Sequence, residues 1–255
     1  MGWFSVEPVD GETAAICENG HWEKPRCWLL LGRGRAALVD SGLGVADLAA
    51  FVRSLTPLPV TVFLTHAHWD HIGGLSAFPD FGMHAAEADW LTQRFPLTDE
   101  QVRRELLREP CAFPEGFRPE NYRVFRGAPA RLLSDGEETD AGGRRLIALH
   151  TPGHSPGHLC FFEPDRGYLY SGDLLYRGCL DAFYPSTDPQ AFLASLRRLL
   201  TLEKQIRRIL PGHRDGALPG GFLRRVAEAF SRLDERGLLR HGSGRHDFGD
   251  FSVRL

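Results

Sequence analysis

Residues 64–74 read Leu64-Thr65-His66-Ala67-His68-Trp69-Asp70-His71-Ile72-Gly73-Gly74, and the rest of the chain is best understood from this stretch. Four side chains of the kinds that bind metals occur within six positions, after the apolar run 60–64 and before two glycines. Two histidines that are two positions apart point in different directions on a helix. They can reach one ion only from a loop, which the end of a strand supplies. Since imidazole and carboxylate are good Zn²⁺ ligands, the stretch predicts a metal site at a strand end.

Three later turns follow one pattern, in which an apolar strand ends in small residues and a metal-binding side chain. The turns are HTPGHSPGH (150–158), SGD (171–173) and PGH (211–213), and their candidate ligands are His154, Asp173 and His213. One such turn alone is weak support, because Gly-His and Gly-Asp are common in ordinary turns. Ligands at the ends of several strands can meet along one sheet edge, where α/β enzymes build their sites. Together the turns predict one shared site.

These motifs are similar to those of a known family. HAHWDH (66–71) resembles the H-x-H-x-D-H signature of the metallo-β-lactamase superfamily, and LVDSG (38–42) resembles its early turn. The three later turns resemble its later metal-binding motifs, so the resemblance spans about residues 11–216. It implies an α/β fold, a four-layer αββα sandwich in which two mixed β-sheets pack face to face with helices outside. It also implies the ligand sets, which are His66, His68 and His154 for one metal, Asp70, His71 and His213 for a second, and Asp173 bridging both.

The resemblance implies a binuclear metal-dependent hydrolase. A metal-bridging hydroxide would attack a substrate carbonyl, with Asp70 as the catalytic residue that orients it. Asp173 stands where the lactam-cleaving branches have cysteine or serine. Residues 172–184 resemble a glyoxalase II segment but lack its lysine, and the insertion before the third motif resembles that of acyl-CoA thioesterases. We therefore expect hydrolysis of a small-molecule thioester or ester, with lactone opening as the nearest alternative.

Two further classes of function remain open. A mononuclear iron persulfide dioxygenase would use fewer ligands and leave Asp70 and His71 without a role. A non-catalytic binding scaffold usually loses ligands, whereas all seven are present here. We expect two divalent ions, Zn²⁺ first, with Fe²⁺ and Mn²⁺ as alternatives because these nitrogen and oxygen ligands accept all three. Metal content and oxygen uptake distinguish the dioxygenase from the hydrolase.

Other polar residues near the motifs are expected to support the site. Asp40 and His158 are expected to orient metal ligands rather than bind metal. Tyr176 and Tyr184 are expected in the substrate pocket, with ordinary core packing as the alternative. We expect the remaining histidines outside the motifs to be solvated or structural; those expected in solvent are His21, His241 and His246.

Composition excludes several classes. The 255 residues carry a formal charge of only −3 and no basic stripe, so we expect no nucleic-acid partner. The five cysteines form no C-x-x-C pair and fit a reducing compartment. The N-terminus lacks a signal-peptide pattern and no apolar run reaches the ~20 residues of a membrane span, so we expect a cytoplasmic protein. A homodimer is left open.

Periodicity predicts the elements between the motifs. Expected strands are 27–31, 35–39, 60–64, 144–149, 159–162, 168–170 and 206–210, and expected helices are 45–55, 85–91, 98–109, 188–202 and 221–236. We expect residues 1–255 to form a single domain, with a helical and irregular insertion at about 94–130. The last fifteen residues, HGSGRHDFGDFSVRL, are expected to be loosely ordered.

Overall fold

The computed structural model describes residues 2–255. The chain divides into two compact units. Unit 1 runs up to Leu133 and includes Asp140–Arg144, and unit 2 comprises Ser134–Thr139 and Arg145–Leu255. Within residues 2–255, no helix is long and apolar enough to cross a membrane.

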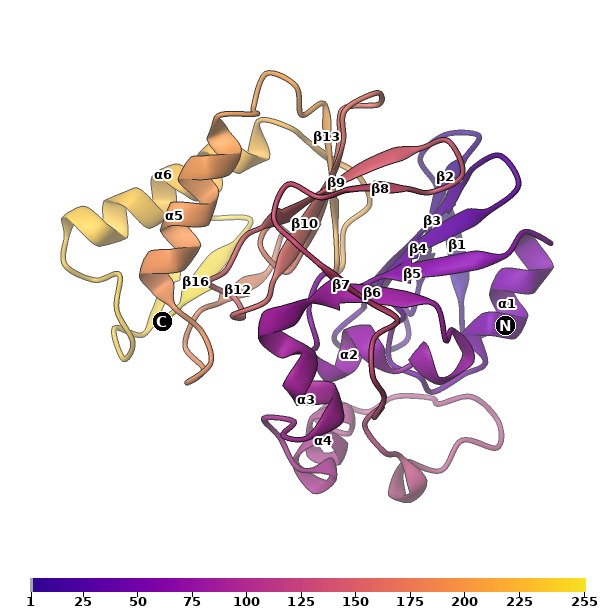
Figure 1. Ribbon diagram of the computed structural model, residues 1–255. Coiled ribbons are helices and arrows are strands. Elements are labelled where there is room, and N and C mark those ends of the chain that lie inside the picture. Colours follow the sequence, from indigo (N-terminus) through magenta and orange to yellow (C-terminus); the bar gives the residue numbers. More distant parts are fainter. Residues whose placement is uncertain (1) are drawn as a thin grey trace. The chain divides into compact units, whose positions relative to one another are not determined.

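Unit 1 contains a mixed seven-stranded sheet, whose strands follow the chain order (Figure 1). The strands are β1 (Ser5–Pro8), β2 (Thr13–Cys17), β3 (Arg26–Leu31), β4 (Ala36–Val39), β5 (Val60–Phe63), β6 (Phe81–His84) and β7 (Arg131–Leu133). The first four pair antiparallel, and β4 to β7 pair parallel. The strands predicted at 27–31 and 35–39 are confirmed as β3 and β4, which pair antiparallel. The parallel half places the carboxyl ends of β4 and β5 side by side, where LVDSG and HAHWDH begin.

The helical segments of unit 1 are short. They are α1 (Leu48–Leu55), α2 (Trp69–Ile72), η1 (Leu75–Ala77), η2 (Ala85–Glu87), α3 (Ala88–Thr92), α4 (Asp99–Leu106) and η3 (Pro119–Asn121). The prediction that the first helix starts at Val45 is wrong by three residues, because the Asp47 side chain accepts a hydrogen bond from Ala50 N and caps the helix there. The helix predicted at 98–109 is present as α4, which begins with a capping box formed by Thr98 and Gln101 and ends three residues earlier than predicted.

The expected insertion at 94–130 belongs to the packing of unit 1. Val124 and Tyr122 are buried in the core of this unit, and the rings of Phe113, Phe117 and Phe125 pack against it. The part of the insertion after α4 is therefore held by its aromatic side chains, although it contains little regular structure.

Unit 2 contains a six-stranded sheet and a three-stranded sheet. The first has the order β14 (Leu218–Pro219), β13 (Arg208–Pro211), β11 (Tyr168–Gly172), β10 (Leu159–Glu163), β9 (Arg145–His150) and β8 (Glu138–Asp140), and the second has the order β12 (Cys179–Asp181), β16 (Ser252–Arg254) and β15 (Arg245–Asp247). Strands β11 and β13 pair parallel, whereas β9, β10 and β11 pair antiparallel. The strands predicted at 144–149, 159–162, 168–170 and 206–210 are all present, with shifts of one or two residues at their ends.

Two helices pack together in unit 2, α5 (Pro189–Leu200) and α6 (Phe222–Glu235). The helix predicted from residue 188 begins there, because Asp188 caps α5 by accepting hydrogen bonds from two main-chain amides and Pro189 occupies the first helical position. The apolar faces of the two helices are buried, and the rings of Phe192 and Phe230 stack at 4.4 Å between centroids.

The prediction of a loosely ordered C-terminus is wrong. Strand β16 pairs parallel with β12 and antiparallel with β15. Phe251, Val253 and Leu255 are buried in the core of unit 2. The segment is ordered because alternate apolar residues of a short strand enter this core, a pattern that the polar and glycine residues around it obscure in the sequence.

Candidate metal centre

In unit 1 the HAHWDH run crosses from a strand end into a single helical turn. His68 is the N-cap residue of α2 and has extended backbone angles, φ −79° and ψ 152°. His66, Asp70 and His71 are buried. Ligand atoms lie within 4.8 Å of one another in the pairs His66–His68, His66–His71 and Asp70–His71. The change from strand to loop to helix thus brings together four side chains that no single regular element could.

Asp40 organises two of these histidines. It follows β4 with φ of 64°, and its carboxylate accepts hydrogen bonds from Thr65 N at 2.8 Å and from His71 Nδ1 at 2.9 Å. The Thr65 hydroxyl also donates its single proton to Asp40, so it accepts from His66 Nδ1 at 3.0 Å. Both rings therefore donate from Nδ1 and keep Nε2 for a metal.

The loop after β4 packs directly on the ligand run. The Ser41 amide and hydroxyl both donate to His71 O, at 2.7 and 2.9 Å, and Gly73 N donates to Gly42 O at 2.8 Å. A Cβ atom at Gly44 would lie 2.3 Å from the carbonyl oxygen of Gly73, so a larger residue has no room there. The two loops behave as one packed structure because their backbones touch.

The buried side chain of Glu18 holds the loop after β4 through a hydrogen bond to its main chain. Glu18 accepts hydrogen bonds from Leu43 N at 2.8 Å and from Trp3 Nε1 at 2.5 Å. Burial raises its pKa to about 7, and the negative charge of Asp70 contributes in the same direction. Tyr122, from the insertion, donates its hydroxyl proton to Leu43 O at 3.0 Å, and burial raises the pKa of this phenol. No sequence motif surrounds Glu18, so its role could not be predicted.

In unit 2 the three candidate ligands converge from three turns. His154 lies in the turn after β9, Asp173 follows β11, and His213 follows β13. Asp173 Oδ2 lies 3.1 Å from His213 Nε2 and 3.5 Å from His154 Nε2. Each of the three residues is at most 5 % exposed. The parallel pairing of β11 and β13 places two of these turns at one sheet edge.

Neighbouring groups orient these unit 2 residues. His154 Nδ1 donates to the carbonyl oxygen of Asp181 at 3.1 Å, so its Nε2 atom is the one available to a metal. His158 Nε2 accepts from Asp173 N at 3.2 Å, and its Nδ1 atom therefore carries the proton that it shares with Thr151 Oγ1 at 3.0 Å. His158 thus contacts the main chain of Asp173 rather than presenting a nitrogen to metal.

Each unit therefore offers a donor set that fits a divalent metal ion. Neutral imidazole and carboxylate are the groups that bind Zn²⁺ and similar ions, and three of the imidazoles, those of His66, His71 and His154, are oriented by a further hydrogen bond. The cysteines offer little competition as ligands or nucleophiles. Burial raises the pKa of Cys17 and of Cys160 to about 12, and it also raises the pKa of Cys179, so these thiols keep their protons.

The tyrosines of unit 2 differ in their surroundings. Tyr176 is 7 % exposed; its ring centroid lies 5.3 Å from that of His213, and its hydroxyl donates to the carbonyl of Cys179. Tyr184 is half-buried and packs against Phe183 at 3.9 Å between ring centroids. The prediction of a solvated His21 is wrong. Its ring is buried, with Nε2 3.1 Å from Leu106 O, because α4 covers it.

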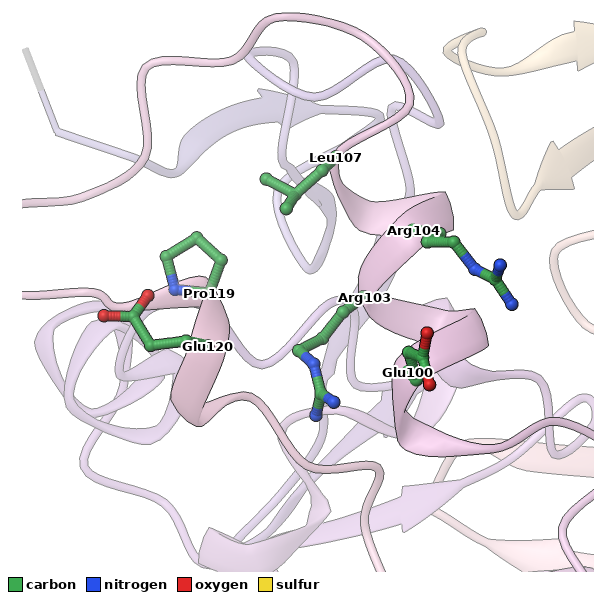
Figure 2. A pocket seen from close by; sticks show the side chains of 6 residues that line it. All are labelled: Glu100, Arg103, Arg104, Leu107, Pro119 and Glu120. Carbon is green, nitrogen blue, oxygen red and sulfur yellow. The ribbon is translucent and has the colours of Figure 1, made fainter.

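A surface hollow of about 610 Å³ lies in the insertion, and none of the residues that line it is a candidate ligand (Figure 2). It lies between α4 and η3, and its lining residues are Glu100, Arg103, Arg104, Leu107, Pro119 and Glu120. Mixed charges surround an exposed leucine, and no group in it resembles the donor sets described above. The chemistry is expected at the histidine and aspartate clusters instead.

The fold and these clusters agree with the similarity of the chain to known proteins. The family model described as the metallo-beta-lactamase superfamily matches residues 22–213, so the chain belongs to this superfamily, whose members bind divalent metals and whose fold is of the α/β class. The chain is 32 % identical over 212 residues to the acyl-coenzyme A thioesterase MBLAC2 of Homo sapiens. The aligned residues cover 77 % of this chain and 74 % of that protein.

Two further relatives are informative. A hydroxyacylglutathione hydrolase of Xylella fastidiosa (strain M23) is 29 % identical over 211 residues, covering 82 % of this chain and 67 % of that protein. The solved structure of TTHA1623 in a di-iron-bound form has a TM-score of 0.60 and 29 % identity, covering 80 % of this chain and 94 % of that one. The family resemblance seen in the motifs is thus confirmed, and the curated relatives named here are hydrolases.

Proposed function

We propose that this chain is a binuclear metal-dependent hydrolase of thioesters or esters. The proposal rests on the orientation of the candidate ligands within each unit. Three histidines donate from Nδ1 to a neighbouring oxygen, which leaves Nε2 as the atom that would bind a metal. His66, His71 and His154 all follow this arrangement. The match to an acyl-coenzyme A thioesterase supports the thioester as the substrate bond.

The assignment of ligands to ions follows the family pattern. His66, His68 and His154 would hold one ion, and Asp70, His71 and His213 the other, with Asp173 shared between them. Zn²⁺ is the ion that we propose first. The di-iron form of a relative supports Fe²⁺ as the alternative, because the same nitrogen and oxygen donors accept either metal.

When bound, the ions would supply Lewis acidity that lowers the pKa of a water molecule and polarises the substrate carbonyl. The chain itself provides orientation and proton handling. Asp70 Oδ2 lies 3.6 Å from His71 Nε2 and its side chain is buried, so it can orient the attacking water and accept its proton. Asp40 keeps His71 in one tautomer throughout. Since the cysteine thiols described above keep their protons, we infer that no covalent thiol intermediate forms.

The experiment combines elemental analysis of purified protein with a panel of thioester, ester and lactone substrates. We expect about two metal ions per chain, and thioester or ester hydrolysis that falls about 100-fold or more in Asp70→Ala because a general acid–base group is lost. Asp89→Asn, which changes an exposed aspartate on α3, is the control and should hydrolyse normally.

Other outcomes would assign the protein differently. Preferential turnover of lactones would replace the thioesterase proposal by a lactonase. One iron per chain, no hydrolysis, and oxygen consumption with a persulfide would refute the hydrolase and support the dioxygenase.

A further inference from the structure

The peptide group between two of the candidate ligands has a partner outside every motif. Ala67 lies between His66 and His68 and is fully buried. A buried main-chain N–H needs an acceptor, because leaving it without one costs free energy. Glu87 Oε2 accepts from Ala67 N at 2.6 Å, and the Glu87 side chain is itself fully buried.

Glu87 comes from a segment that contacts the ligand run twice. It ends the turn η2 and precedes α3, but its side chain makes no capping bond to α3. It reaches across to the ligand run instead. Three residues later, the Trp90 ring stacks on the His68 ring with centroids 6.1 Å apart and planes within 8°. The start of α3 thus holds both the backbone and one imidazole of the H-x-H pair.

This hydrogen bond lies between two candidate ligands, His66 and His68, and therefore affects the orientation of both. Any rotation of the Ala67 peptide turns the chain on both sides, and therefore both imidazoles. Metal ions bind tightly only when their ligands hold a fixed geometry, and partners outside the ligands are commonly worth about 10- to 100-fold in metal affinity. From this arrangement we propose that Glu87 is a positioning residue that sets the metal affinity of the His66–His68 pair. The inference rests on the metal-dependent function proposed above.

The reach of the carboxyl group, rather than its charge, is the property that the hydrogen bond requires. Glu87→Gln keeps the side-chain length and an acceptor oxygen but removes the negative charge. Glu87→Asp keeps the charge but is shorter by one C–C bond, about 1.5 Å, and cannot span the gap without movement. The two variants therefore separate positioning from electrostatic attraction to the metal.

The experiment measures the Zn²⁺ dissociation constant of the full chain by competition with a chromogenic chelator, with the Co²⁺ absorption spectrum as a report of ligand geometry. We expect Glu87→Asp to bind Zn²⁺ about tenfold or more weakly and to show an altered Co²⁺ spectrum. Glu87→Gln should stay within about threefold of the wild type, with the same spectrum.

The matched control is Glu163→Asp, which shortens another buried glutamate. Glu163 lies in unit 2 at the end of β10 and accepts a hydrogen bond from the Tyr170 hydroxyl at 3.1 Å. Its variant should bind Zn²⁺ as the wild type does. The proposal is overturned if Glu87→Asp keeps wild-type affinity, if Glu87→Gln binds more weakly than Glu87→Asp, or if the control loses as much affinity. A wild-type chain that binds no divalent metal would instead refute the proposed function itself.

Discussion

Replacing Glu18 by glutamine should remove a pH dependence from the stability of the protein. Burial raises the pKa of this carboxyl from its usual 4.5 to about 7. The folded state therefore holds the proton more tightly than the unfolded state does. The stabilisation that this gives is complete below pH 4.5 and is lost as the pH rises to about 7. At about 1.4 kcal/mol for each pH unit, the loss amounts to about 3 kcal/mol.

Glutamine tests this value because it cannot ionise yet can still accept from Leu43 N. We expect the free energy of unfolding of Glu18→Gln, relative to the wild type, to increase by about 3 kcal/mol between pH 4.5 and 7.5. Urea denaturation of metal-free protein across this range measures the difference, and titrations common to both proteins cancel. Glu12→Gln, at an exposed position, controls for the change in net charge. Parallel stability curves for Glu18→Gln and the wild type would refute the assignment.

Two further substitutions test the supports of the two units. In Asp40→Asn, asparagine can adopt the left-handed backbone of residue 40, but its amide N–H group would face the donor Thr65 N or His71 Nδ1. The Zn²⁺ affinity, measured by competition with a chelator, should therefore fall about 10- to 100-fold. An unchanged affinity would contradict the role of Asp40 in orienting His71. Arg254→Ala removes two hydrogen bonds to Asp181, at 2.9 and 2.7 Å, and should lower the free energy of unfolding measured in urea by about 2 kcal/mol. An unchanged midpoint would show that this pair adds nothing to the strand pairing and apolar contacts of β16.

The identities of the candidate ligands could be predicted because each depends on neighbours in the chain. His66 and His68 lie two residues apart, after an apolar strand and before two glycines, and this local pattern alone is enough to indicate a metal ligand. The capped start of α5 was predictable for the same reason, since Asp188 and Pro189 are adjacent. Local signals of this kind also placed the seven predicted strands to within two residues of their observed ends, but they did not indicate the other strands of the structure.

The supports of the ligands could not be predicted, because their partners are distant in sequence. Glu87 holds an amide twenty positions away, and Glu18 holds one twenty-five positions away. Neither residue stands in a pattern that sets it apart from a surface glutamate. The C-terminal strand was missed for a related reason. Its order depends on pairing with β12, more than seventy residues earlier.

In unit 1, three carboxyl side chains from outside the ligand run each hold a different main-chain amide. Asp40 accepts from Thr65 N, Glu87 from Ala67 N, and Glu18 from Leu43 N. Each acceptor fixes a segment that contains or touches a candidate ligand, and each accepts from a different amide. The stiffness of this half of the site therefore comes from several separate elements rather than from the signature itself. A chain that kept HAHWDH but lost these acceptors would retain its ligands without their geometry, so an intact signature does not by itself establish a competent metal site.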